Sequence, residues 1–131
     1  MSSLKFHHIG VACAKIANEI EYYNLLGYIQ QEEMFEDPQQ GVRGLFMYNN
    51  GTLIELLEPI NEKSPVRSFI DRGIHMYHQG FTCENIQDEV ELLEAKGALM
   101  VSLPKDAIAF PSFKVCFLIM PNQTLIELIG S

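Results

Sequence analysis

The chain has 131 residues and a formal net charge of −8, and hydrophobic residues make up 47% of it. This length and composition predict one globular domain, residues 1–131. The negative charge disfavours nucleic acids and anionic membrane surfaces as partners, and no apolar run is long enough to span a bilayer. Three cysteines without a CxxC pair, and an N-terminus without a signal-peptide core, predict a reduced, cytoplasmic protein.

The first 60 residues predict a strand, a helix and three further strands. The stretch FHHIGVAC (6–13) is rich in β-branched, aromatic and small residues, as is typical of a strand. Apolar residues at helical spacing predict a helix from about residue 16 to 26, and Gly27 ends it. The tripeptide Asn49-Asn50-Gly51 is a hairpin-turn sequence. The three strands after the helix are expected at about 28–35, 43–49 and 52–58.

Residues 61–72 predict a linker with one short helix that begins near Pro65. The elements of the first module then recur in residues 73–131. A second helix, capped by Asn85 or Asp88, is expected to end at Gly97. Three strands follow it, at about 98–103, 114–120 and 124–130, and Pro121-Asn122 turns between the last two.

The two halves of the chain also repeat at the level of residues. The stretch 78–98 aligns with 8–28 without a gap, an offset of 70, and the pentapeptide TLIEL occurs at 52–56 and again at 124–128. Identical residues on the first strand are His8/His78, Gly10/Gly80 and Cys13/Cys83. The sequence therefore predicts an α+β fold of two βαβββ modules, 1–60 and 73–131, which form one curved mixed sheet around a cleft.

One histidine and one glutamate of each module are expected on the same face of the sheet. Strand side chains alternate between faces. The helix should cover the continuously apolar face of the first strand, which carries Ile9, Val11 and Cys13. His8 then lies on the free face, and the same alternation places Glu55, His78 and Glu127 there. If the modules bring their free faces together, two imidazoles and two carboxylates converge, which predicts a divalent-metal site.

Structural explanations exist for each of these residues alone. A single strand histidine is more often exposed or hydrogen-bonded than a ligand, and a glutamate on an edge strand hinders aggregation. The symmetric placement of all four favours ligands, because two buried carboxylates without partners each cost several kcal/mol.

The pattern His-x-Gly followed by Ile-Glu-Leu, present twice, resembles the vicinal oxygen chelate superfamily. Its members include glyoxalase I, methylmalonyl-CoA epimerase, extradiol dioxygenases and the bleomycin- and fosfomycin-resistance proteins. The resemblance covers essentially the whole chain. It implies four metal ligands: His8, Glu55, His78 and Glu127. His7 and His75 do not match ligand positions.

Two stretches, EDPQQGVRGLFMYNNGTLIELLEP and SPVRSFIDRGIHMYHQGF, look most like the epimerase branch. In that branch a further glutamate, on the strand near residues 43–48, is a catalytic base. The matching position here is Gly44, which cannot move a proton, so the departure argues against true methylmalonyl-CoA epimerase activity. Glyoxalase I-like chemistry does not need that residue, because metal-bound carboxylates move the proton. The resemblance maps these carboxylates onto Glu127 and Glu55.

The predicted function is a metal-dependent, glyoxalase-like enzyme of the lyase or isomerase type. It would transfer a proton on a small 2-oxo, hemithioacetal or thioester substrate, with Glu127 and Glu55 as catalytic residues. The expected cofactor is one divalent ion per site, Zn, Ni, Co or Mn. The alternative is a small-molecule binding protein of the bleomycin-resistance type without catalysis.

Substrate contacts are expected from one cation and three aromatic residues: Arg43, Phe46, Tyr48 and Phe110. A solvated surface position is the more common explanation for such a cation, and core packing is the usual explanation for a stripe of aromatic residues. Residues 103–114 are loop-like and are predicted to close over the metal. A homodimer is expected because a sheet this small exposes an edge and an apolar helix flank.

Overall fold

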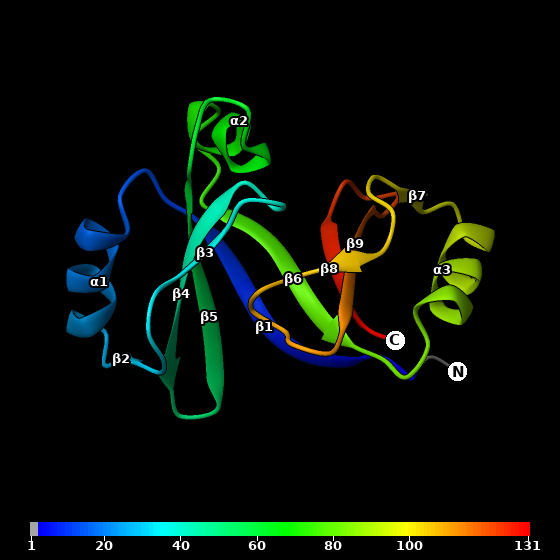
Figure 1. Cartoon of the computed structure of the whole chain (residues 1–131), viewed down its shortest axis with the longest axis horizontal. Coiled ribbons are helices and arrows are strands. Elements are labelled where there is room, and N and C mark those ends of the chain that lie inside the picture. The colour runs from blue at the N-terminus through cyan, green and yellow to red at the C-terminus, as the bar shows by residue number, and fades with distance from the viewer. Residues whose placement is uncertain (1–2) are drawn as a thin grey trace. The chain divides into compact units, whose positions relative to one another are not determined.

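The computed structural model describes residues 3–131, which contain three helices and ten strands (Figure 1). The first module consists of β1 (Lys5–Ala12), α1 (Ile16–Leu25), β2 (Ile29–Gln30), β3 (Phe35–Asp37), β4 (Val42–Asn49) and β5 (Thr52–Pro59). After α2 (Pro65–Asp71), the second module consists of β6 (Met76–Thr82), α3 (Ile86–Ala95), β7 (Leu99–Met100), β8 (Lys105–Asp106), β9 (Lys114–Ile119) and β10 (Leu125–Gly130). The α+β class and the repeated order of elements are confirmed. Within residues 3–131, no helix is both long and apolar enough to cross a membrane.

The chain divides into two compact units. The N-terminal unit comprises residues 8–77, and the C-terminal unit comprises residues 78–131 together with the described residues before His8. The boundary therefore falls inside β1 and β6. Residues 61–72, including the short helix that the sequence predicted, lie inside the N-terminal unit.

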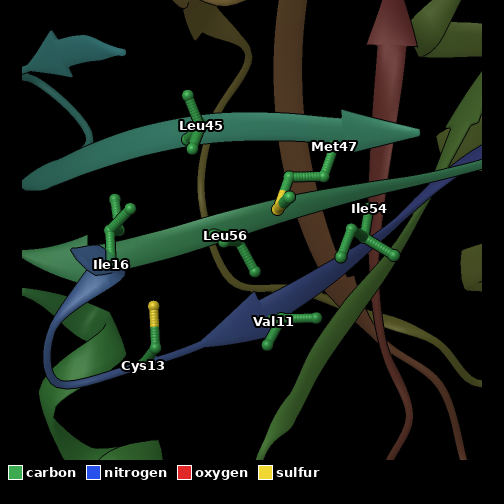
Figure 2. Packing of buried hydrophobic residues seen from close by; sticks show 7 residues of the cluster. All are labelled: Val11, Cys13, Ile16, Leu45, Met47, Ile54 and Leu56. Carbon is green, nitrogen blue, oxygen red and sulfur yellow. The ribbon is translucent and has the colours of Figure 1, made fainter. Parts of the chain in front are cut away.

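In the N-terminal unit the strands are ordered β2-β4-β5-β1, and β3 also pairs with β4. The pair β1–β5 is parallel, and the pairs with β4 are antiparallel. Helix α1 lies beside β4 and β5 (Figure 1). The apolar face of these strands packs with the start of α1 in a buried cluster, the N-terminal core (Figure 2): Val11, Cys13, Ile16, Leu45, Met47, Ile54 and Leu56.

The C-terminal unit repeats this arrangement, with the strand order β6-β10-β9-β7 and with β8 paired to β9. Strands β6 and β10 are parallel, whereas β9 is antiparallel to β10, β7 and β8. Helix α3 lies beside β7 and β10 (Figure 1). The buried cluster on the helix side, the C-terminal core, consists of Ile86, Val90, Ala98, Cys116, Leu118, Ile126 and Leu128.

Each module has one strand more than predicted, because one expected strand is interrupted. Instead of a single strand at 28–35, β2 and β3 pair with different parts of β4, Gln30 opposite Met47 and Phe35 opposite Gly44. Gln30 and Phe35 are five residues apart in the chain, whereas their partners Met47 and Gly44 are only three apart. Two residues between β2 and β3 therefore cannot pair with β4 and bulge out of the sheet. The second module interrupts 98–103 in the same way, with Met100 opposite Leu118 and Lys105 opposite Val115.

The predicted helix ends and turns are confirmed by the backbone. Gly27 and Gly97, just after α1 and α3, have φ of 92° and 103°, a conformation that glycine adopts without steric cost. Asn85 caps α3, since its Oδ1 accepts a hydrogen bond of 2.9 Å from Asp88 N. Asn50 and Gly51 both have positive φ between β4 and β5, as a two-residue hairpin of this type requires.

Helix α1 is capped differently, because Lys15 at its N-cap makes no side-chain cap hydrogen bond. Instead Glu58, at the end of β5, accepts a 2.8 Å hydrogen bond from Ile16 N with its Oε1. A carboxylate at this end of the helix satisfies a free N–H and interacts favourably with the helix dipole.

Equivalent helix glutamates hold the segment that leads into a first strand. In the C-terminal unit, Glu89 of α3 accepts hydrogen bonds from Ser3 N and Oγ at 3.1 and 2.6 Å. In the N-terminal unit, Glu19 of α1 lies 3.6 Å from His75 Nε2. Ser3 precedes β1 and His75 precedes β6, so each helix contacts the lead-in segment of the other module's first strand.

Candidate metal centre

In the N-terminal unit, the site residues are His8 on β1 and Glu55 on β5. In the parallel pairing of these strands, Glu55 lies opposite Gly10, which has no side chain to obstruct the carboxylate. His8 lies two residues before Gly10 and therefore shares its face. Glu55 Oε1 is 3.2 Å from His8 Nε2, and the two residues are 4% and 0% exposed.

The C-terminal unit builds the same pair from His78 on β6 and Glu127 on β10. Glu127 lies opposite Gly80, so a glycine again leaves space beside the carboxylate. Glu127 Oε1 is 3.3 Å from His78 Nε2, and both residues are buried. In both units, two strands that are far apart in the chain pair and bring a histidine and a glutamate together. The two nitrogen–oxygen distances differ by only 0.1 Å.

Both pairs lie on the sheet face that points away from the adjacent core. In β5, Ile54 and Leu56 belong to the N-terminal core, and Glu55 between them points to the opposite face. In β10, Ile126 and Leu128 belong to the C-terminal core and flank Glu127. The alternation predicted from the sequence therefore describes these strands.

A phenylalanine lies on the other side of each glutamate. Phe46 on β4 is opposite Glu55, and Phe117 on β9 is opposite Glu127. Phe117 was not predicted as a site residue. The repeat offered a signal for it, because 117 minus 46 is 71, between the offsets of 70 and 72 that relate the histidines and the glutamates. We call Gly10, Glu55 and Phe46, and equally Gly80, Glu127 and Phe117, the Gly–Glu–Phe row of each unit.

The donor atoms of each pair suit a divalent ion. Two ligands bound at about 2.1 Å are ~3.0 Å apart at adjacent octahedral corners and ~3.4 Å apart at tetrahedral corners. The nitrogen–oxygen separations of 3.2 and 3.3 Å lie between these values. They are at or just beyond the long end of N–H···O hydrogen bonds. One imidazole nitrogen and one carboxylate oxygen form a donor set that transition metals accept.

Arg43 lies on the helix side of β4, not on the face of Phe46 and Glu55. Its Nε donates to Glu36 Oε1 at 2.8 Å, and its Nη1 donates to Glu58 Oε2 at 2.6 Å. These hydrogen bonds, the one to Glu36 first, raise the pKa of the guanidinium. Since Glu58 also caps α1, Arg43 connects β3, β4, β5 and the helix, and we leave it out of the proposed substrate contacts.

The predicted aromatic residues lie in different places. Phe46 and Tyr48 alternate with core residues along β4 and therefore share the face of Glu55. Phe110 is in the C-terminal unit, where its ring is 5.5 Å from the ring of His7, edge to face. The segment 103–114 is not all loop, because it contains β8 and the first residue of β9. Its closure over a metal stays a prediction.

Gly44 is on the same face of β4 as Phe46, and the ring of Phe35 fills the space beside it. A Cβ atom built on Gly44 would be 2.2 Å from Phe35 Cζ, far inside van der Waals contact. The Phe35 and Phe46 rings pack edge to face at 6.0 Å. An apolar ring therefore occupies the position toward which a side chain at residue 44 would project.

The buried thiols are kept protonated. Burial, followed by the charges of Glu19 and Glu58, raises the pKa of Cys13 to about 12. Burial also raises the pKa of Cys116 to about 12, with smaller effects of Cys83 and Glu127. Cys13 belongs to the N-terminal core and Cys116 to the C-terminal core, so both thiols lie on the helix side of their sheets and not on the face of the histidine–glutamate pairs.

Comparison with known proteins gives a family match over most of the chain. The family model described as Glyoxalase/Bleomycin resistance protein/Dioxygenase superfamily matches residues 7–117. The uncharacterised protein YqjC of Bacillus subtilis is 30% identical over 93 residues, which are 68% of this chain and 64% of YqjC. The ethylmalonyl-CoA/methylmalonyl-CoA epimerase of Cereibacter sphaeroides is 29% identical over 119 residues, 87% of each chain. The crystal structure of a hypothetical protein from Bacillus halodurans has a TM-score of 0.84 at 29% identity, covering 99% of this chain and 96% of that one.

Proposed function

This chain belongs to the glyoxalase/bleomycin resistance protein/dioxygenase superfamily, and from this membership we propose that it is a metal-dependent enzyme that moves a proton on a small acyl thioester or 2-oxo compound. The epimerase among its relatives supports an enzyme of the isomerase type. The observation that carries the proposal is the buried histidine–glutamate pair, built in the same way in both units.

We propose that the two pairs together hold one divalent ion. His8, Glu55, His78 and Glu127 would each supply one donor atom, an imidazole nitrogen or a carboxylate oxygen. Bound there, a divalent ion would act as a Lewis acid and stabilise negative charge that develops on a substrate carbonyl oxygen. The charge balance supports this, because an ion offsets the cost of burying two carboxylates.

Glu127 and Glu55 are the proposed proton carriers. The C–H bond next to the substrate carbonyl breaks, an O–H bond forms on the carboxylate, and the electron pair moves toward the carbonyl group. Return of the proton to the opposite face of the same carbon gives the epimer, and return to the neighbouring carbon gives an isomer. A carboxylate is suited to this task only if its position is fixed, and the imidazole at 3.2 to 3.3 Å provides such a restraint.

Gly44 limits which residues can act as the catalytic base. No side chain of residue 44 can serve as a base, and the Phe35 ring occupies the adjacent space. The proposed proton path therefore uses the two site glutamates alone. With an aromatic wall of Phe35 and Phe46 beside Glu55, we expect a substrate whose group at this wall is apolar. Tyr48 and Phe110 stay as proposed substrate contacts, and a cytoplasmic homodimer stays a prediction.

The metal is tested first, by plasma mass spectrometry of purified protein. We expect about one transition-metal ion per chain in the wild type, and loss of the ion in His8→Ala and in Glu127→Ala. His75→Ala is the matched control, because His75 has a half-exposed side chain and is not a proposed ligand. Absence of metal in the wild type, even after reconstitution with Zn, Ni, Co or Mn, would refute the proposal and favour a binding protein.

Proton transfer is tested by NMR in D₂O with the metal-loaded protein. The two probes are methylmalonyl-CoA and the hemithioacetal of methylglyoxal and glutathione. We expect deuterium to enter the carbon next to the carbonyl of at least one probe, and to enter far more slowly with Glu127→Gln. Metal binding with no exchange on either probe would contradict the proposed proton transfer on these two substrate classes.

A further inference from the structure

The two phenylalanines of the Gly–Glu–Phe rows contact the site histidines as well as flanking the glutamates. The Phe46 and His8 rings have centroids 5.9 Å apart and planes at 89°. The Phe117 and His78 rings have centroids 5.3 Å apart and planes at 84°. Perpendicular, edge-to-face packing at this separation is a preferred aromatic arrangement, because the positive edge of one ring meets the negative face of the other.

These rings are not part of the helix-side cores. Phe46 alternates with the core residues Leu45 and Met47, and Phe117 alternates with Cys116 and Leu118. Both phenylalanines therefore face away from α1 and α3, toward the histidines and glutamates. Packing against a helix does not explain two aromatic residues at these places.

An imidazole on a strand needs such a neighbour if its orientation is to be fixed. The χ2 torsion of histidine is broad, so χ1 alone does not determine where Nε2 points. Each site histidine has a carboxylate oxygen at its Nε2 and an aromatic ring perpendicular to its plane. The two contacts act on different directions of the imidazole, and together they restrict its rotation.

We propose that Phe46 and Phe117 are positioning residues, which hold the His8 and His78 imidazoles with Nε2 facing the paired carboxylate. The expected effect on metal affinity depends on the proposed function, whereas the effect on the imidazoles does not. Phe46 thereby has a role in addition to the substrate contact that the sequence suggested. Phe117 becomes its equivalent in the other unit.

The first test uses metal-free protein, so that it is independent of the ion. Phe46→Leu and Phe117→Leu keep apolar bulk but remove the ring. The control is Phe81→Leu, because Phe81 also packs edge to face with an aromatic ring, that of Phe6 at 5.9 Å, but lies on the core side of β6. The readout is the ¹⁵N signal of Nε2, because loss of a ring current by itself moves nearby proton signals, whereas the ¹⁵N signal follows the contact of Nε2 with the carboxylate. We expect the Nε2 signal of His8 to move in Phe46→Leu and that of His78 to move in Phe117→Leu.

The second test measures Co²⁺ affinity by titration of the visible absorption bands. Loss of one edge-to-face contact should weaken binding about threefold to tenfold in Phe46→Leu and in Phe117→Leu. Phe81→Leu should leave it unchanged, and Phe117→Tyr, which keeps the ring, should bind like the wild type.

The outcomes separate the two proposals. Unchanged imidazole signals in both site variants, or equal shifts in Phe81→Leu, would overturn the positioning role. Equal affinity in all variants would overturn its consequence for the metal. If the wild type binds no Co²⁺, the proposed function fails, and the histidine signals of the metal-free protein still decide the positioning role.

Discussion

The two units agree at the Gly–Glu–Phe row and differ at the neighbouring rows of the same sheet face. On that face Phe35 of β3 lies opposite Gly44 in the N-terminal unit, and Lys105 of β8 lies opposite Val115 at the equivalent place in the C-terminal unit. Directly opposed residues share a face. One copy therefore presents an aromatic ring where the other copy presents a cation, although the histidine–glutamate pairs are nearly identical.

The helix-side faces differ by one charge at equivalent positions. In the N-terminal unit Arg43 bonds both Glu36 and Glu58, the residues opposite it on β3 and β5. The equivalent cation of the C-terminal unit, Lys114, pairs with Asp106 at 2.8 Å, and its opposite residue on β10 is Gly130. A Cβ at Gly130 would be 2.6 Å from Cys83 O, so no carboxylate fits there. The two units are therefore alike in the row that holds a proposed metal ligand and unlike in the neighbouring rows.

The largest expected effect tests whether the two glutamates are equivalent. Glu55→Gln and Glu127→Gln each keep the shape of the side chain but remove its ability to take a proton. We expect proton exchange to fall by at least about 100-fold in both, the usual contribution of a general base. Glu36→Gln, at an exposed position, is the control and should exchange at the wild-type rate. Full activity in one of the two site variants would show that a single glutamate carries the proton.

The second effect tests the packing of the Phe35 ring against Gly44, where the C-terminal unit has Lys105 opposite Val115. Gly44→Ala places a Cβ 2.2 Å from the Phe35 ring, and overpacking of this kind costs about 1–3 kcal/mol of the free energy of unfolding. Urea denaturation measures it. In a Phe35→Ala background the same substitution should cost much less, because the obstructing ring is gone. Additive losses in the double variant would mean that the ring and residue 44 are not coupled.

The third effect compares the two helix N-termini. Glu58→Ala removes the carboxylate that caps α1, and Asn85→Ala removes the side chain that caps α3. Asn85→Ala should lower the free energy of unfolding by about 1 kcal/mol. Glu58→Ala should lower it further, because it also removes the hydrogen bond that Arg43 donates to Glu58. Glu62→Ala, outside both caps, controls for the loss of a charge. A loss from Asn85→Ala alone would show that the carboxylate of Glu58 does not replace a conventional cap.

The smallest effect concerns the repeated cysteines, Cys13 and Cys83. Burial raises the pKa of both, to about 12 for Cys13, whereas Cys83 is only partly buried. We expect a disulfide reagent to modify Cys83 first at pH 8 and to leave Cys13 and Cys116 unmodified in the folded protein. Modification of all three at one rate would contradict this ranking.

The raised pKa of Cys13 also predicts how the free energy of unfolding changes at alkaline pH. The folded chain keeps the Cys13 proton up to about pH 12, whereas an ordinary thiol loses it near 9.0. The contribution to stability is therefore complete below about pH 9 and is lost as the pH rises from 9 to 12. The urea midpoint should fall over this interval in the wild type and fall less in Cys13→Ser.

Much of this protein could be predicted from local sequence. Helix ends follow from Asn85, Gly27 and Gly97, because caps and positive φ are properties of a few adjacent residues. The alternation of β5 and β10 placed Glu55 and Glu127 opposite the apolar residues, since strand periodicity needs no knowledge of the partner strand. The repeat supported the predicted site a second time, because a histidine and a glutamate occur at equivalent positions in both halves of the chain.

Only the tertiary structure decided which residues of other strands lie beside the site histidines and glutamates. The parallel pairing of β1 with β5 places Gly10 next to Glu55 across more than forty residues of chain, and the sequence contains no local signal for that register. The Phe35 ring beside Gly44 was missed for the same reason, whereas Phe117 was missed although the repeat offered a signal for it. Arg43 was expected near a substrate, yet its side chain is engaged by Glu36 and Glu58, which the sheet brings to it from two other strands. Alternation and capping are set by neighbours in sequence, whereas cross-strand contacts are set by register, and register is fixed only when the whole sheet forms.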